Sequence, residues 1–331
     1  MVTLQDVADK AGVSPATVSR VVRGEGKVGD KCRAHVKKII KKMGYRPNTN
    51  ARALASNKTE IVGIIVPNIS SPFFGALAIG AEEAAYKAKY KVLMGNTHND
   101  PKIEQDLIDS FLEQGCQNII LHSKFTDDKT LIKWAKEIKG LVLVNRFIPE
   151  IASRCIWLDN VSGGRQIAEY LVNKGHEKFA VIMSHLKISD PIDRIVGIRQ
   201  ALATKGLELP EENIIYNNAG MEAGEKAVYE LLDREIDFTA LICFNDSVGI
   251  GAINALFERG YNVPKDVSVV GFDDIIIANV CRPKLTTMKY PIGKMAMYAT
   301  NLSMQLTNNS EQDESKTHLF MPTLTERLSV Q

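Results

Sequence analysis

The sequence lacks the signals of several large classes of protein. Its five cysteines are scattered and form no Cys-x-x-Cys pair, which argues against a disulfide framework or a zinc site and fits a reducing compartment. The longest strongly apolar run, 61–66, is far shorter than the roughly 20 residues that cross a membrane. The N-terminus has no charged head followed by an apolar run, so we expect no secretory signal. These absences predict a cytoplasmic protein with no membrane partner.

Signatures of common enzymes are also absent. No Gly-x-Gly-x-x-Gly follows the run 61–66, and neither Gly-x4-Gly-Lys-Ser/Thr nor Gly-x-Ser-x-Gly occurs. The six histidines show no metal-ligand spacing; His98 and His122 come near expected strand ends, where a structural role is the favoured interpretation. We therefore expect no catalytic residue, no metal and no cofactor. An α/β enzyme with a cryptic site is a less favoured alternative.

The charge of the chain is unevenly distributed. The 331 residues allow two or three domains, and 45% are apolar, which is ordinary for a globular protein. Residues 1–58 hold 13 Lys and Arg against four Asp and Glu, whereas the remaining residues hold 28 against 35. A basic head on an acidic body predicts a polyanion such as nucleic acid as the partner of the head. A solvated basic helix face is the alternative.

The first 45 residues have the pattern of three short helices. Helical spacing relates the apolar residues of the first helix, which are Leu4, Val7, Ala8 and Ala11. Thr3 and Ser14 are suitable N-caps, and Gly12 ends the first helix. The third helix is expected over 30–43. Two helices joined by a glycine-containing turn and closed by a third form the helix-turn-helix plan, although a three-helix protein-binding module is the alternative.

The outward-facing side chains of the second helix are small except for that of Arg20. Val18, Val21 and Val22 give this helix an inner face. Small outward residues allow a helix to lie close to base edges in the major groove. Arg20 can bind guanine through two hydrogen bonds, which is worth about 1–3 kcal/mol of base discrimination.

This head resembles that of the lactose/galactose-repressor family of bacterial transcription regulators. The resemblance lies in 6–8, 11–14 and 17–21 and continues through 44–48 and 50–55. In that family the second stretch is a hinge helix that orders on DNA, which implies that Leu54, with Ala51 beside it, wedges between base steps in the minor groove. A plain linker is the alternative.

Two positions depart from the family: Gly29 replaces the usual Ser cap of the third helix, and Arg23 replaces Asn, which adds a phosphate contact. The DNA-binding residues expected are Thr3, Ser14, Pro15, Ala16, Thr17, Ser19, Arg20, Arg23, Asn48, Ala51 and Leu54.

After residue 58, apolar runs alternate with helical stretches. Strands are expected over 61–66, 92–95, 119–121, 141–144, 179–183, 214–216, 241–244 and 267–272, and helices over 73–88, 103–114, 131–138, 195–206, 224–232 and 248–259. This alternation is typical of βα units around parallel sheets that are buried on both faces. Two such series predict two doubly wound lobes with a ligand cleft at the carboxyl ends of the strands.

The residues that follow these strands are suited to a sugar. They include Asn145, Asn245 and Asp273, with Asp190 and Arg194 after the strand 179–183. Such side chains supply paired donors and acceptors for hydroxyl groups, and aromatic rings supply a flat apolar face. Each has another interpretation: Asn245 and Asp273 as helix caps, Phe73 and Phe74 as core, Arg194 as a structural ion pair.

The body resembles the effector-binding core of the same family, which is similar to a periplasmic sugar-binding protein, and it is most similar to the galactose-repressor branch. The resemblance implies an effector site of Ile69, Phe73, Phe74, Asn145, Asp190, Arg194, Asn245 and Asp273. Ala219 stands where several relatives have an aromatic, which removes one stacking contact. The chain ends without a leucine heptad, so a homodimer rather than a tetramer is expected.

The sequence therefore predicts a transcriptional repressor of a sugar-utilisation operon, released from operator DNA by a monosaccharide inducer such as galactose. A corepressed regulator of the purine type is the alternative, followed by a sugar-binding protein without a DNA role, such as a periplasmic receptor. The expected organisation is a helix-turn-helix domain at 1–45, a linker with the hinge helix at 46–59, and a core at 60–331 whose N-lobe is 60–159 with 292–320 and whose C-lobe is 160–291 with 321–331.

Overall fold

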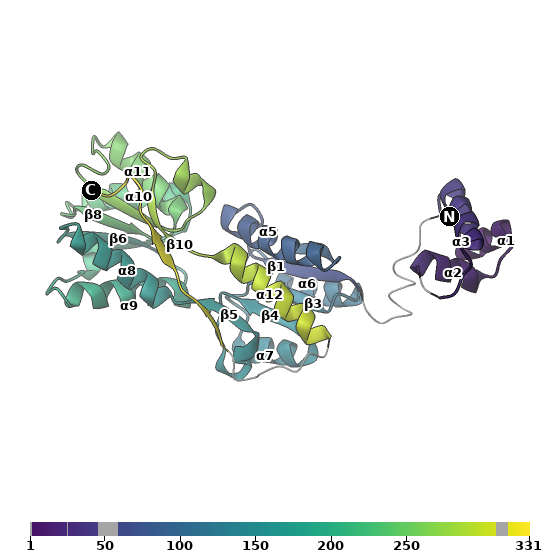
Figure 1. Ribbon diagram of the computed structural model, residues 1–331. Helices are drawn as coiled ribbons and strands as arrows, with labels where there is room; N and C mark the ends of the chain where they lie inside the picture. The colour runs from purple at the N-terminus through teal and green to yellow at the C-terminus, as the bar shows by residue number, and fades with distance from the viewer. Residues whose placement is uncertain (1, 25, 46–58, 309–316) are drawn as a thin grey trace. The chain divides into compact units, whose positions relative to one another are not determined.

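The computed structural model describes residues 2–24, 26–45, 59–308 and 317–331. The chain divides into a small unit, Met1–Thr59, and a large unit, Glu60–Gln331 (Figure 1). The expected hinge helix, with Asn48, Ala51 and Leu54, lies outside the described residues, as does the side chain of Arg23.

The small unit is a bundle of three helices, α1 (Leu4–Ala11), α2 (Pro15–Arg23) and α3 (Asp30–Met43). Its core contains the apolar residues Val7, Ala8, Val18, Val21 and Val36. Thr3 forms the capping box with Asp6, and the Ser14 hydroxyl accepts from the Thr17 N–H at 3.2 Å. Gly29 is the N-cap of α3 and forms no side-chain hydrogen bond there, because glycine has no side chain. These caps fix the α1–α2 turn and hence the direction of α2.

The large unit contains two six-stranded sheets, each belonging to one lobe. The first lobe has the strand order β11-β5-β4-β3-β1-β2 and the second β12-β10-β9-β8-β6-β7. All pairs are parallel except β10 with β12. The strands are β1 (Ile61–Val66), β2 (Lys91–Asn96), β3 (Asn118–Leu121), β4 (Gly140–Val144), β5 (Cys155–Leu158), β6 (Phe179–Ser184), β7 (Ile214–Asn217), β8 (Ala240–Cys243), β9 (Ser268–Asp273), β10 (Thr286–Lys289), β11 (His318–Phe320) and β12 (Thr323–Thr325).

Helices cover both sheets, as expected for parallel strands that are buried on both faces. The helices are α5 (Pro72–Lys87), α6 (Pro101–Glu113), α7 (Asp128–Glu137), α8 (Asn160–Asn173), α9 (Ser189–Ala203), α10 (Met221–Asp233), α11 (Asp246–Glu258) and α12 (Ile292–Thr307), with short 3-10 helices η1 (Pro149–Arg154), η2 (Glu211–Asn213) and η3 (Ile276–Asn279). The α/β fold class expected from the sequence is confirmed.

The chain crosses between the lobes three times. It passes from β5 to α8, from β10 to α12 and from β11 to β12, since α12 packs on α5, β3 and β4 of the first lobe and α8 packs on α9 of the second (Figure 1). Three crossings allow the lobes to change their separation while each sheet stays intact.

Two features differ from the sequence expectation. The helix expected at 195–206 begins six residues earlier, at Ser189, so Asp190 and Arg194 lie on α9 rather than before it. The sequence pattern also gave no indication of α8 and α12 or of the strands β5, β10, β11 and β12. All four missed strands lie at or next to the edges of the sheets, and each is only three or four residues long, which leaves little periodic pattern to recognise.

Candidate functional site

The outward face of α2 has the character expected for a DNA-reading helix. Ala16 and Arg20 are exposed, and Thr17 and Ser19 are half-buried. Thr3, Ser14 and Pro15 lie at the helix starts, where the hydroxyls of Thr3 and Ser14 are already used as caps. The Arg20 side chain lies beside Gly26, where an added Cβ would be 3.2 Å from Cδ. Glycine at this position therefore leaves room for the Arg20 side chain.

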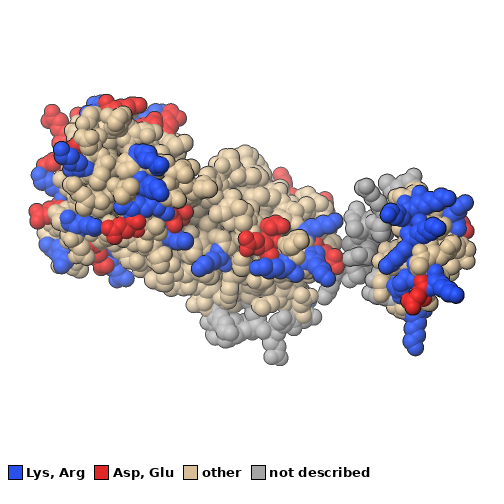
Figure 2. Space-filling model, turned by 45° about the horizontal axis from the view of Figure 1, so that its top comes forward, with Lys and Arg blue, Asp and Glu red and all other residues tan. Residues whose placement is uncertain are grey.

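Basic side chains surround this helix. Lys and Arg cover much of the visible surface of the helical unit in Figure 2. The exposed cations are Lys10, Arg20, Lys27, Lys31, Lys37, Lys38, Lys41 and Lys42. Such a density of cations attracts a polyanion independently of its sequence.

The large unit has a cavity of about 390 Å³ between its lobes. Seven of the eight expected effector residues line it: Phe73, Phe74, Asn145, Asp190, Arg194, Asn245 and Asp273. Ile69 does not: its side chain is 46% exposed, and its backbone N–H donates to Asn96. The cavity is built from the carboxyl ends of strands in both lobes, which is where ligands of such sheets bind. We call it the first cavity.

Arg194 is held in the first cavity by both packing and hydrogen bonds. Its guanidinium lies over the Phe272 ring at 3.4 Å from the centroid, and Nε donates to Asn160 Oδ1 at 2.9 Å. Burial lowers the pKa of Arg194, an effect that the nearby Asp273 and Asp190 carboxylates oppose. Because Arg is protonated at any ordinary pH, the group stays a fixed cation with a fixed direction.

Asp273 supplies the matching acceptor. Asp273 lies at the carboxyl end of β9. Its backbone φ is 107°, a value that residues other than glycine rarely adopt. Burial raises the pKa of this carboxyl well above its ordinary value, while Arg194 acts in the opposite direction. The carboxylate forms no hydrogen bond within the part of the chain that the structure describes, so its oxygens are available to a ligand.

Asp190 connects the two lobes. Its carboxylate accepts from Lys124 Nζ at 3.0 Å, Asn145 Nδ2 at 3.2 Å and Asn160 Nδ2 at 3.3 Å. Burial would raise the pKa of Asp190, but Lys124 and Arg194 outweigh it and hold the pKa below the ordinary value. Asp190 is therefore an ionised group at the centre of the cleft.

An aromatic surface borders the first cavity. Phe73 contacts Phe74 and Tyr290 edge to face, with centroids 5.2 and 5.0 Å apart, and Phe74 contacts the His122 ring at 4.9 Å. Burial lowers the pKa of His122 to about 3, so the imidazole is neutral. Among described atoms, His122 Nδ1 and the Tyr290 hydroxyl are buried without a hydrogen-bond partner. A ligand in this cavity can satisfy both.

Asn245 is both a helix cap and a cavity residue. Its Oδ1 accepts from the Val248 N–H at 2.9 Å as the N-cap of α11, and its Nδ2 donates to the Ala219 carbonyl at 3.0 Å. Sequence reasoning missed Lys124 and Tyr290 and assigned His122 a structural role. Lys124 and His122 follow β3 directly, so the strand-end argument applied to Asn145 could have found them, whereas Tyr290 follows a strand that was not recognised.

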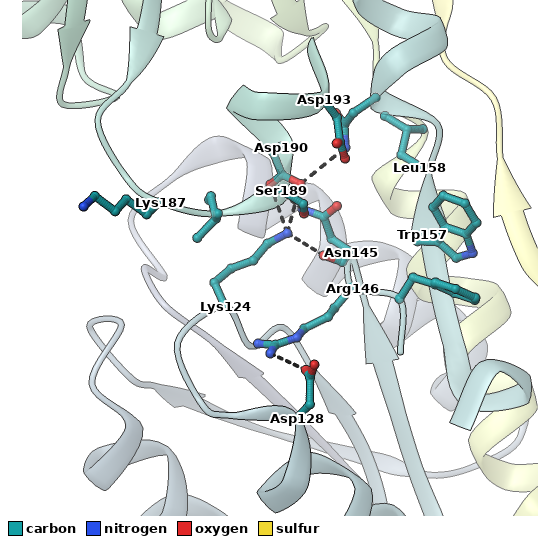
Figure 3. Close-up of a pocket in the computed structure, with 13 residues that line it drawn as sticks. Lys124, Asp128, Asn145, Arg146, Trp157, Leu158, Lys187, Ser189, Asp190 and Asp193 are labelled. Carbon is teal, nitrogen blue, oxygen red and sulfur yellow. Dashed lines mark hydrogen bonds and ion pairs between the residues drawn. The ribbon is translucent and has the colours of Figure 1, made fainter. Parts of the chain in front are cut away.

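A second cavity of about 440 Å³ adjoins the first (Figure 3). Its lining includes the aromatic residues Phe147 and Trp157 and the ion pair between Arg146 and Asp128. No group of His, Cys, Asp and Glu within the described residues is arranged to hold a metal ion, and none of the described helices has the length and apolar character to cross a membrane.

Family models match both parts of the chain. A model of bacterial regulatory proteins of the lacI family matches residues 3–48, and a model of a periplasmic binding protein-like domain matches residues 168–330. The transcriptional regulator GalS of Salmonella typhimurium is 40% identical over 330 residues, covering 100% of this chain and 97% of the relative. GalR of Escherichia coli is 38% identical, covering 100% and 96%. These relatives are transcription regulators and not enzymes.

Solved structures have the same architecture. A complex of the transcriptional regulator CelR with cellobiose superposes with a TM-score of 0.72 at 28% identity, covering 99% of this chain and all of the other. The Lac repressor dimer bound to operator and an anti-inducer superposes with a TM-score of 0.88 at 24% identity, covering 99% and 98%. At that identity the second likeness concerns the fold alone.

Proposed function

Because the chain belongs to the lacI family of bacterial regulatory proteins, we propose that it is a transcriptional repressor that a monosaccharide of the galactose type releases from its operator. The observation that carries the proposal is the first cavity, in which a fixed cation, open carboxylate oxygens and an aromatic surface face one ligand, on the same chain as a basic helix-turn-helix unit. The relatives named GalS and GalR support the galactose-type interpretation.

The small unit reads the operator. Its cations neutralise phosphates, which gives affinity, and α2 enters the major groove, where Arg20 reads a base. Thr17 and Ser19 donate to phosphates, and Thr3, Ser14, Pro15 and Ala16 allow the helix starts to approach the backbone closely. Arg23, Asn48, Ala51 and Leu54 complete the proposed DNA contacts, with Leu54 as the wedge in the minor groove.

The first cavity binds the sugar ring. Asp273 accepts from hydroxyl groups and Arg194 donates to them, while Phe73 and Phe74 present apolar surface to the C–H face of the ring. Asn145, Asp190 and Asn245 contribute further polar contacts, and we keep Ile69 as a contact made when the cleft closes. The absence of an aromatic at Ala219 leaves that side of the cavity to polar contacts.

Sugar binding shifts the lobes and thereby the affinity for DNA. A ligand can shift this equilibrium only by its differential affinity for the two states, and a change from 1:99 to 99:1 needs about 5.5 kcal/mol. Since the cavity includes residues of both lobes, closing it around a sugar is a source of such a difference. We place the protein in the cytoplasm as a homodimer that reads a pseudo-palindromic operator, which its membership of the lacI family supports.

The test uses the intact protein and a duplex enriched by it from a random pool. Galactose is expected to weaken binding of this duplex in a fluorescence anisotropy titration, whereas mannitol, an open-chain polyol control, has no effect. The Asp273→Asn variant is expected to bind the duplex with wild-type affinity and to lose the galactose response, because the carboxylate is the acceptor of the site.

The alternatives give different results. Stronger DNA binding with a purine base would indicate corepression. Galactose binding without DNA binding at low salt would indicate a sugar-binding protein alone. A full galactose response in Asp273→Asn would refute the role of Asp273.

A further inference from the structure

Four residues line both cavities and therefore form the wall between them: Lys124, Asn145, Ile188 and Asp190. Lys124 follows β3 in the first lobe, and Asp190 lies in the first turn of α9 in the second lobe. The Lys124 side chain reaches across the view in Figure 3 to Asp190 and Asn145. The ion pair measures 3.0 Å, and its side chains are 6% and 8% exposed. A buried ion pair thus joins the lobes and divides the cleft.

The surrounding hydrogen bonds hold this pair in place. Lys124 Nζ also donates to the Asn145 carbonyl, and Asn145 Nδ2 donates back to Asp190. Asn160 donates to Asp190 and accepts from Arg194, so the pair is tied to the first cavity. A neutral ligand that displaced Lys124 would leave a buried carboxylate without its cation, which is strongly unfavourable. The wall therefore resists an uncharged ligand.

The second cavity has the features of a site for another sugar ring. The Phe147 and Trp157 rings contact each other in a tilted arrangement, with centroids 4.9 Å apart and an interplanar angle of 37°, and Arg146 pairs with Asp128 at 2.7 Å. The Asp193 carboxylate has no hydrogen-bond or ion-pair partner among the described residues. Aromatic faces beside paired donors and acceptors are the same combination as in the first cavity.

The charges of the second cavity point to a neutral ligand. Its cations Lys124 and Arg146 already have acidic partners. The remaining cation, Lys187, is exposed at the rim, and the negative charge of Asp193 offsets its positive charge in the sum over the lining residues. An anionic ligand therefore finds no unbalanced positive charge inside.

We propose that the Lys124–Asp190 pair limits the effector to a single sugar ring by closing the passage between the two cavities. The second cavity is then a subsite for a second ring, which a sugar can reach when the Lys124 side chain is shortened. The proposal rests on the proposed function, because it takes the first cavity as the monosaccharide site. Both cavities, at about 390 and 440 Å³, fall within the size range of small-molecule sites. A disaccharide with one ring in each must pass between Lys124 and Asp190.

The first experiment compares galactose with lactose on the intact wild-type protein by isothermal titration calorimetry. Lactose is expected to bind at least about 100-fold more weakly than galactose, since it must break a buried ion pair. Lactose binding within about tenfold of galactose would overturn the proposal. Absence of galactose binding would instead contradict the proposed function.

The second experiment shortens the wall. In Lys124→Ala, the ratio of lactose to galactose affinity is expected to rise by about 100-fold, because the passage between the cavities is open. The matched control is Lys133→Ala, which removes the lysine of an exposed ion pair with Glu137 on α7, outside the lining of both cavities. Its ratio of lactose to galactose affinity stays at the wild-type value. If Lys124→Ala lowers the Tm too far for titration, Lys124→Ser gives the same comparison. A wild-type ratio in a folded Lys124 variant overturns the proposal.

Tryptophan fluorescence locates the second ring. The chain has two tryptophans, and Trp157 lines the second cavity, whereas Trp134 is buried on α7. Lactose is expected to change the emission of Lys124→Ala but not that of Lys124→Ala with Trp157→Phe. Lactose binding that leaves the Trp157 emission unchanged would place the second ring elsewhere and overturn the subsite.

Discussion

The guanidinium of Arg194 has both a structural role and a place in the first cavity, and the sequence alone does not show which of the two applies. It packs over the Phe272 ring and donates to Asn160, which makes it part of the second lobe, and it also lines the first cavity beside Asp273. The structural role of Arg194 therefore comes from Phe272 and Asn160, since Arg194 forms no ion pair among the described residues, and this role is compatible with binding a ligand. The same holds for Asn245, which caps α11 with its oxygen and lines the cavity.

Arg20 carries the sharpest prediction at the scale of one residue. Arg20→Ala is expected to relax discrimination at a single base pair by about 1–3 kcal/mol, because it removes a long side chain with two donors from the exposed face of α2. Binding to a panel of single-base variants of the enriched duplex measures this effect. Arg20→Lys is the control: it keeps the charge but lacks the two-donor geometry, so discrimination falls while phosphate attraction stays. Equal weakening on all duplexes would refute base reading by Arg20.

Single residues also show the limits of sequence reasoning. Seven of eight expected effector residues line one cavity, because strand ends and a helix start meet there. Sequence reasoning favoured a structural role for His122 and missed Lys124. Their position after β3 is visible in the sequence, but whether either side chain faces the cleft depends on contacts that are distant in the sequence. Their environment depends on Asp190, 66 residues beyond Lys124.

At the scale of elements, close contact between helices positions the site. Helices α8 and α9 cross so closely that a Cβ on Gly197 would lie 1.9 Å from the Val161 carbonyl oxygen, and one on Gly164 would lie 2.1 Å from that of Arg194. Glycine is required there because the obstacle is backbone. This crossing fixes the position of α9 and hence of Asp190 and Arg194.

Gly197→Ala is expected to destabilise the protein by about 1–3 kcal/mol and to weaken galactose binding, because the two helices must separate. Gly75→Ala is the matched control: it also lies in a helix, α5, but its Cβ would meet no atom within 4 Å, so the protein should be unchanged or slightly more stable. Denaturant unfolding of both variants measures the difference. Equal stability of the two would contradict the tight crossing.

Asp246 forms hydrogen bonds from the start of α11 to neighbouring elements, and its titration makes the free energy of unfolding depend on pH. Its carboxylate accepts from the Thr287 hydroxyl on β10 and from the Ile275 N–H at 2.7 Å. Burial raises the pKa of Asp246 to about 7. Because the folded form holds the proton more tightly than the unfolded form, the contribution of Asp246 to stability is fully present below about pH 4 and falls as the pH rises to about 7.

The free energy of unfolding measured between pH 4 and 7 is therefore expected to fall more for the wild type than for Asp246→Asn. The shift corresponds to a few kcal/mol at most, on the order of 1.4 kcal/mol per pKa unit. The asparagine variant cannot titrate and keeps one carbonyl oxygen for the Ile275 N–H. The same pH slope in both proteins would show that Asp246 is not the titrating group.

At the scale of the whole molecule, charge separates the two activities. The basic residues are concentrated in 1–58, and the remainder is acidic. DNA affinity is expected to fall steeply with salt, with a slope of about −0.9 in log K against log salt for each phosphate neutralised. The affinity for galactose, a neutral ligand, should change little over the same range. Anisotropy and calorimetry on one preparation test both, and parallel salt dependence of the two would refute the separation.

The sequence by itself determined the three short helices, the two βα series and the basic head, because these depend on local spacing, caps and composition. It also brought together seven residues that line one cavity, since strand ends in such sheets meet at one edge. Tertiary structure decided what depends on distant contacts: the α8–α9 crossing and the Lys124–Asp190 pair that divides the cleft. The physical reason is that burial and pairing of a charge are properties of its neighbours in space, which local sequence does not encode.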